Sequence, residues 1–327
     1  MSVFLLSKHK VMHPLRMKKQ NQFSIIGTGA VGGYYGGLLQ RAGFDVHFLV
    51  NHDYEHVAKH GLQIDSINES FRLPEVKAYH QPEHMPCCDV VIVALKTTAN
   101  EVLKDILPHV VGDHSVVLTL QNGQGSDEEI SEIVGADHVL GGLCFLCSNK
   151  IGPGHINHLD YGLITLGEYR ADGKPGGITP RLEHITAQLQ SAGIPSRMVE
   201  DLAHARWKKL VWNIPFNGLS VVRNQLTDEL IKNPETRKLC LTLMQETATA
   251  SAAVCRPIEP EFIEKMIADT ERMEPYAPSM KLDYDRGNPM EIEAIYGHPI
   301  RAAEQAGIDM PETRKLYEEL KILNPAV

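Results

Sequence analysis

The sequence predicts an α/β protein with a doubly wound parallel sheet, an antiparallel extension of that sheet and an all-helical C-terminal domain. A short apolar strand runs into Gly27-x-Gly29-x-x-Gly32 and then into a helical pattern that ends near Ala42. Apolar strands alternate with helical segments over the next part of the chain, and no segment of the last third has the pattern of a strand. The alternation is typical of a parallel α/β sheet, and the last third is typical of a helical domain.

The glycine-rich turn has the spacing of a dinucleotide-binding loop. Gly27 lets the chain leave a strand in a tight turn, Gly29 lets backbone N–H groups approach a pyrophosphate, and Gly32 lets the helix pack close to the strand. The helix N-terminus favours the phosphate charge. A second strand at 45–50 completes the β-α-β unit, so we predict a Rossmann-type domain. The predicted cofactor contacts in this loop are Gly27, Thr28, Gly29, Ala30, Val31 and Gly32.

Further polar residues fall where other strands of this sheet end. The second strand ends at Asn51-His52, a continuous apolar strand ends at Lys96, and the next strand is followed by Asn122. Ligands of such sheets bind at the carboxyl ends of the strands. We therefore expect these residues and the glycine-rich loop to surround one crevice.

The chain divides into three predicted parts. These are a disordered basic leader at 1–21, a dinucleotide-binding domain at 22–200 and a helical substrate-binding and catalytic domain at 201–327. Short strands with Gly and His between them at 141–167 predict the antiparallel extension. Amphipathic helices are predicted at 201–222, 226–252, 259–272, 296–306 and 312–321.

Composition argues against several classes of protein. The chain has 327 residues, of which 43% are hydrophobic and 22% charged, as in a globular enzyme of about two domains. A net charge of -9 argues against a nucleic-acid partner, and no apolar stretch approaches the ~20 residues of a membrane span. Six cysteines in so long a chain do not form a secreted disulfide framework, so we expect a cytoplasmic location. No metal is expected, because neither His56 with His60 nor His80 with His84 has the pattern of a metal site.

A second group of polar residues lies in the predicted helix at 201–222. Lys209, Asn213 and Asn217 are spaced by four, and each such step turns only about 40° around a helix, so the three side chains share one face. By itself this pattern is equally consistent with an ordinary solvent-exposed polar stripe.

Taken together and in order, the motifs of this chain resemble the ketopantoate reductase family (2-dehydropantoate 2-reductase). The resemblance covers about residues 23–323. The motifs that carry it are Gly27-x-Gly29-Ala30-Val31-Gly32-x-x-x-Gly36, Leu95-Lys96, Gln121-Asn122-Gly123-x-Gly125, Trp207-x-Lys209-Leu210-x-x-Asn213-x-x-x-Asn217, and Ser279 with Glu291.

The resemblance implies NADPH-dependent reduction of 2-dehydropantoate to pantoate, a step towards pantothenate and coenzyme A. It implies that Lys209 is the general acid and that Glu291 orients or balances it. The remaining cofactor contacts that we expect are Asn51, His52, Lys96, Asn122 and Glu291. The substrate contacts that we expect are Asn122, Lys209, Asn213, Asn217 and Ser279. The expected partner is a small 2-oxo acid, and a homodimer is the candidate assembly.

The sequence departs from the family pattern in a few places, and two alternatives to this function stay open. The family usually has an Arg after the second strand, where the adenosine 2′-phosphate lies, and this chain has Asn51-His52. We therefore expect a smaller preference for NADPH over NADH. Changes after Asn217 and before Ser279 loosen the substrate assignment. The alternatives are an NADP-dependent reductase of another branched 2-oxo acid and a catalytically silent NADPH-binding redox sensor.

Overall fold

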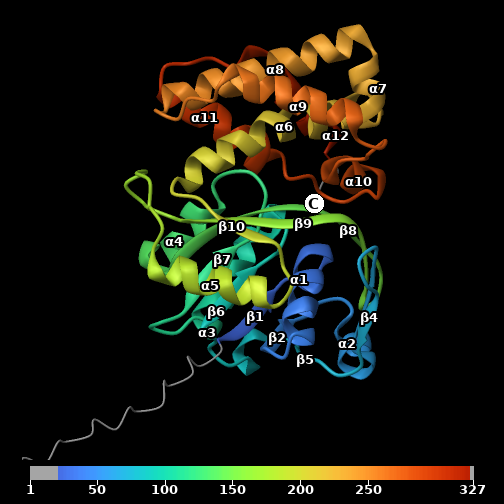
Figure 1. The fold of residues 1–327 in the computed structure, drawn as a ribbon, viewed down its shortest axis with the longest axis vertical. Coiled ribbons are helices and arrows are strands. Elements are labelled where there is room, and N and C mark those ends of the chain that lie inside the picture. The colour runs from blue at the N-terminus through green and yellow to red at the C-terminus, as the bar shows by residue number, and fades with distance from the viewer. Residues whose placement is uncertain (1–20, 325–327) are drawn as a thin grey trace, which may run out of the picture.

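The computed structural model describes residues 21–324, so the leader predicted at 1–21 lies outside the described residues except for its last residue. Figure 1 shows an α/β part, coloured blue to green, and above it a layer of helices, coloured yellow to red. The elements of the α/β part are β1 (Gln22–Ile26), α1 (Ala30–Arg41), β2 (Asp45–Leu49), α2 (Tyr54–His60), β3 (Leu62–Ser66), β4 (Phe71–Leu73), β5 (Lys77–Tyr79), β6 (Val90–Val93), α3 (Leu103–Val110), β7 (Val116–Thr119), α4 (Ser126–Val134), β8 (Val139–Gly152), β9 (His155–Glu168), α5 (Pro180–Ser191) and β10 (Ser196–Met198).

These strands form one sheet in the order β4-β3-β9-β8-β7-β6-β1-β2-β5, with β10 paired to β9. The central strands β2, β1, β6, β7 and β8 run parallel, and β8 pairs antiparallel with β9. This arrangement confirms the predicted Rossmann-type sheet with an antiparallel extension.

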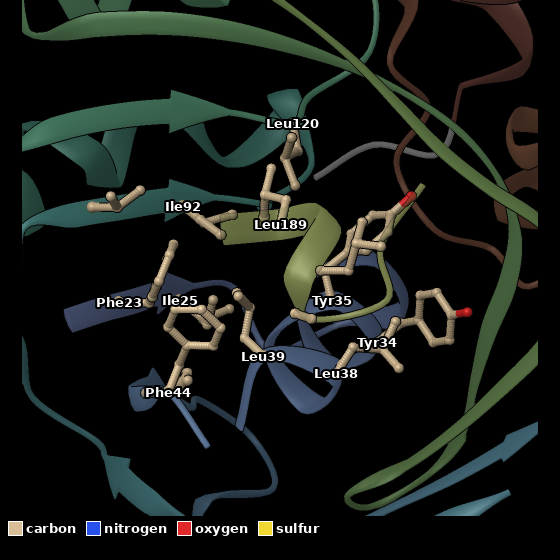
Figure 2. Packing of buried hydrophobic residues seen from close by; sticks show 14 of the residues in the cluster. Phe23, Ile25, Tyr34, Tyr35, Leu38, Leu39, Phe44, Ile92, Leu120 and Leu189 are labelled. Atoms are coloured by element: carbon tan, nitrogen blue, oxygen red, sulfur yellow. The ribbon is translucent and has the colours of Figure 1, made fainter. Parts of the chain in front are cut away.

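Both faces of the central sheet are buried, as expected for parallel strands. Ile92 of β6 packs with Phe23, Tyr35 and other residues of the first core (Figure 2). Val93, the next residue of β6, belongs instead to a second core under α3 and α4. Since successive side chains of a strand point to opposite faces, an unbroken apolar run serves both cores.

The sequence pattern does not predict the edges of the sheet. Strand β3 pairs with β9 towards one end of the sheet, and the short strand β5 lies beside β2 at the other end. Neither β4, β5 nor helix α4 is predicted by the sequence pattern. The two short strands have three residues each, which is too few for an alternating pattern to be recognised.

The C-terminal part contains helices α6 (Leu202–Val222), α7 (Thr227–Lys232), α8 (Pro234–Ala253), α9 (Pro260–Arg272), α10 (Ser279–Asp285), α11 (His298–Gln305) and α12 (Pro311–Leu323), with a π-helical turn at Glu293–Gly297 before α11. The single helix predicted at 226–252 is wrong. Asn233 ends α7, and its side chain accepts the Glu235 N–H at the start of α8, while Pro234 takes the first helical position. Helix α10 was also not predicted. No helix among residues 21–324 is long and apolar enough to cross a membrane.

Candidate active site

The glycine-rich loop has a backbone shape that fits a dinucleotide. Gly27 has a positive φ of 98°, which favours glycine, and a Cβ on Gly32 would lie 2.2 Å from the Gly27 carbonyl oxygen. A Cβ on Gly29 would meet only open space, and no side chain caps the N-terminus of α1 behind it. The loop therefore leaves the first N–H groups of α1 available for a pyrophosphate.

The other predicted residues of this loop have structural contacts of their own. Ala30 and Val31 begin α1, and the Thr28 hydroxyl donates to the Leu49 carbonyl at the end of β2, at 2.9 Å. After β2, the side chains of Asn51 and His52 are exposed. The bond from Thr28 to Leu49 therefore ties the glycine-rich loop to the end of β2, just before Asn51 and His52.

Lys209 of α6 reaches across to the carboxyl ends of the strands. Its Nζ donates to Asn122 Oδ1 at 2.6 Å and to the Cys144 carbonyl of β8 at 2.9 Å. Burial lowers the pKa of Lys209 to about 8, and the positive charge of Arg206 acts in the same direction. The amine can therefore both hold and release a proton near neutral pH.

Glu291 joins the two parts of the chain from the other side. Its carboxylate accepts the Thr97 N–H at 2.9 Å and the Asn122 side-chain N–H at 3.5 Å, and it lies 3.6 Å from Lys96 Nζ. Lys96 is also paired with Asp283 at 2.7 Å. Although burial works to lower it, the pKa of Lys96 is raised by these two carboxylates. Glu291 thus meets Lys209 through Asn122 and contacts Lys96 directly.

The predicted substrate residues lie around the same helix. Asn213 and Asn217 are 6% and 2% exposed, so this face of α6 is not a solvent-exposed stripe. Asn217 Oδ1 accepts the Met280 N–H at 3.1 Å, which fixes the start of α10 beside α6. Ser279, the half-buried first residue of α10, is the immediate neighbour of that bond. The contact therefore brings Ser279 next to Asn217, although about sixty residues separate them in sequence.

A buried ion pair behind Asn122 was not predicted from the sequence. Arg206 of α6 donates to Asp127 of α4 through Nε at 2.5 Å and Nη2 at 2.7 Å, and the two residues are 6% and 3% exposed. Arg206 Nη1 also donates to the carbonyls of Gln121 and Gly123, at 3.4 and 3.1 Å. These bonds hold both sides of the turn that presents Asn122. A single Arg and a single Asp 79 positions apart form no recognisable sequence motif.

Replacing Arg206 by methionine is expected to lower the free energy of unfolding by about 3–5 kcal/mol, because Asp127 is left buried and unpaired. Urea unfolding measures this loss. The double variant Arg206→Met/Asp127→Leu should recover most of the stability, since neither charge remains. If the pair also positions Asn122, the double variant keeps a reduced kcat. Full recovery of both stability and kcat would limit the pair to a structural role.

A cavity of about 470 Å³ lies between the two parts of the chain. It is lined by Asn100 and Gln124 from one part and by Glu291 and His298 from the other. Neither Lys209 nor the glycine-rich loop lines this cavity, and Glu291 is the residue that both lines it and contacts Asn122. No group of three or more His, Cys, Asp or Glu side chains within residues 21–324 is placed to hold a metal ion.

A glycine-rich loop with the shape of a dinucleotide site, together with a buried lysine that the helical part places at the carboxyl ends of the same sheet, is typical of a dinucleotide-dependent oxidoreductase. Comparison with known proteins makes this specific. Residues 23–171 match the family described as ketopantoate reductase PanE/ApbA, and residues 201–324 match its C-terminal counterpart. The chain therefore belongs to the ketopantoate reductase family, as the sequence motifs predicted.

Individual relatives agree with this assignment. The chain is 51% identical over 305 residues to the 2-dehydropantoate 2-reductase of Nostoc sp. The aligned residues cover 93% of this chain and 96% of the relative. The crystal structure of 2-dehydropantoate 2-reductase from Geobacter metallireducens is 40% identical, with a TM-score of 0.88 over 92% of this chain and 99% of that one. The enzyme of the same name from Methylococcus capsulatus is 30% identical, with a TM-score of 0.84 and coverage of 92% and 96%.

Proposed function

We propose that this chain reduces 2-dehydropantoate to pantoate with NADPH. The observation that carries the proposal is Lys209, a buried amine of lowered pKa that faces Asn122 at the carboxyl ends of the strands. Membership of the ketopantoate reductase family supports both the reaction and the cofactor. A redox sensor would need only the dinucleotide-binding part, so the buried polar face of α6 argues against that alternative.

Lys209 suits the role of proton donor because of its hydrogen-bond geometry. When bound, NADPH supplies the hydride, and the ketone oxygen of the substrate then gains negative charge that needs a proton. An ammonium group has three N–H donors, and Asn122 and Cys144 account for two of them in Lys209. The third N–H is left for the substrate oxygen. Asn122, held by Glu291, fixes the position of the amine.

Neutral donors next to Lys209 suit the carboxylate of a 2-oxo acid. Ser279 and the amides of Asn213 and Asn217 supply hydrogen bonds without changing the charge around the lysine. Ser279→Ala and Asn217→Ala are each expected to raise the KM of the 2-oxo acid by the equivalent of about 1–3 kcal/mol, while the KM of NADPH changes little. Steady-state kinetics with each substrate varied in turn measures both constants.

Asn217→Ala has an additional expected effect, because it also removes the acceptor of the Met280 N–H and so loosens α10. Ser279→Ala is therefore the cleaner variant, and Ser131→Ala on α4 is a matched control outside the site. Unchanged substrate KM values in both site variants would contradict this placement of the substrate carboxylate.

The reaction is tested by NADPH oxidation with 2-dehydropantoate and with a panel of other branched 2-oxo acids. The proposal expects the highest kcat/KM for 2-dehydropantoate. A clearly higher value for another acid would favour the alternative reductase, and binding of NADPH without turnover of any acid would favour the sensor. A location in the cytoplasm and assembly as a homodimer are further parts of the proposal, to be checked by cell fractionation and by light scattering.

A further inference from the structure

A lysine of the β8–β9 hairpin lies between two loops of the dinucleotide-binding part. Lys150 Nζ is 3.1 Å from the Thr28 carbonyl oxygen in the glycine-rich loop and 2.7 Å from Asp53 Oδ2, which follows β2. In a Rossmann fold, the adenosine ribose lies between these two loops. We propose that Lys150 binds the 2′-phosphate of NADPH and supplies the positive charge that the residues directly after β2 lack. This inference rests on the proposed function, because it takes NADPH as the cofactor.

The negative charge of Asp53, after β2, would by itself weaken the binding of a 2′-phosphate. An acidic residue in this region accepts bonds from the ribose hydroxyls and repels a 2′-phosphate, and Asp53 lies there. Although burial works to raise it, the pKa of Asp53 is lowered by Lys150 and by the Gly154 N–H, so the carboxylate is ionised. Lys150 cancels this negative charge, and without it the end of β2 would favour NADH.

The hairpin is built to direct Lys150 towards the cofactor loop. Ser148 and Lys150 are two positions apart on β8 and share one face, and their side chains donate to the carbonyls of Ala30 and Thr28. The pairing of β8 with β9 is irregular directly after Lys150, and such a bulge changes the direction of a side chain.

The tip of the hairpin is anchored as well. The Gly154 N–H donates to Asp53 at 2.7 Å, and the Gly154 carbonyl accepts the Gln63 N–H at 2.8 Å. These bonds fix the turn that follows β8, the strand that carries Lys150. Its ammonium uses two N–H groups, on Thr28 and Asp53, and the side chain is 30% exposed. One N–H donor therefore remains for a phosphate oxygen, and the pair with Asp53 presents no net negative charge to it.

Equilibrium binding of NADPH and NADH to the full chain, followed by nucleotide fluorescence without any 2-oxo acid, tests this inference. Lys150→Met is expected to weaken NADPH binding by roughly 10- to 100-fold, the range for a lost charge-assisted hydrogen bond, and to change NADH binding little. Lys150→Arg should keep most of the preference. Lys59→Met, which removes an exposed lysine of α2, is the control for net charge and should leave both affinities unchanged.

The variant Asp53→Asn gives an independent test, because it should shift the preference between NADPH and NADH in the opposite direction to Lys150→Met. Removing the carboxylate is expected to raise the affinity for NADPH relative to NADH, and adding Lys150→Met to this variant should lower it again. Thermal unfolding of the nucleotide-free variants reports any loss of the hairpin contacts. If Lys150→Met does not fold, the inference is still tested by the ratio of the NADPH and NADH affinities, measured in Asp53→Asn and in Lys150→Arg.

Two results would overturn the inference: equal weakening of both nucleotides by Lys150→Met, or no weakening of NADPH. Either result leaves the proposed reaction intact. Failure of the unmodified chain to bind NADPH more tightly than NADH would instead contradict the cofactor of the proposed function itself.

Discussion

Replacing Lys209 by alanine is expected to lower kcat by roughly 10²–10⁴-fold, the range for loss of a general acid, with little change in the Kd of NADPH. The amine lies on α6 and contacts Asn122 and Cys144, whereas the glycine-rich loop that we expect to bind the phosphates precedes α1. Lys208→Ala is a matched control, because Lys208 is the neighbouring residue of α6 and lies over the Phe262 ring. Stopped-flow or steady-state kinetics with saturating NADPH measures the loss.

The pH dependence gives a second test of the same role. Burial lowers the pKa of Lys209 to about 8, and reduction needs the protonated amine, so kcat for reduction should fall about tenfold per pH unit above that value. The reverse reaction, oxidation of pantoate, needs the neutral amine and should rise with pH up to the same value. Residual activity in Lys209→Arg should not fall near pH 8, because guanidinium stays protonated there. Near-normal turnover in Lys209→Ala would exclude this lysine as the proton donor.

Local sequence rules predicted the parts of the site that depend on neighbouring residues. The turn around Gly27 and Gly32 follows from backbone geometry alone, and the shared face of Lys209, Asn213 and Asn217 follows from helical spacing. The family and the α/β fold with its antiparallel extension are confirmed. The catalytic, cofactor and substrate roles of the individual residues stay predictions.

Contacts between distant segments could not be predicted in this way. Arg206 and Asp127 are ordinary residues of two helices, and only the packing of α6 on the sheet buries them together. Lys150 lies in an irregular part of β8, and its approach to Asp53 depends on the pairing of β9 with β3, which the sequence pattern did not reveal. Such contacts are fixed by topology, and strand order is not encoded in the periodicity of any one segment.

Replacing Glu291 by glutamine is expected to lower kcat/KM by roughly 10- to 100-fold, although the side chain keeps its size. Glu291 is 4% exposed, and its carboxylate accepts N–H groups from Thr97 and Asn122. Glutamine has one acceptor oxygen, which the Thr97 N–H occupies, and its own NH₂ would face the NH₂ of Asn122. Rotation of the Asn122 amide relieves that clash but turns a donor towards the ammonium of Lys209. The amine then loses the acceptor that aims it.

The charge of Glu291 also acts on the pKa of Lys209. The carboxylate raises that pKa, so its removal should lower it further, and the fall in kcat for reduction should begin at a lower pH than in the unmodified enzyme. Glu293→Gln is the matched control, because Glu293 lies two residues further on, is exposed and contacts Tyr317 and Arg301 rather than Asn122 or Lys96. A Glu291→Gln enzyme with unchanged kcat and an unchanged pH profile would show that Glu291 neither orients Asn122 nor sets the charge of Lys209. A change in the Kd of NADPH alone would instead limit Glu291 to the cofactor side of the site, next to Lys96.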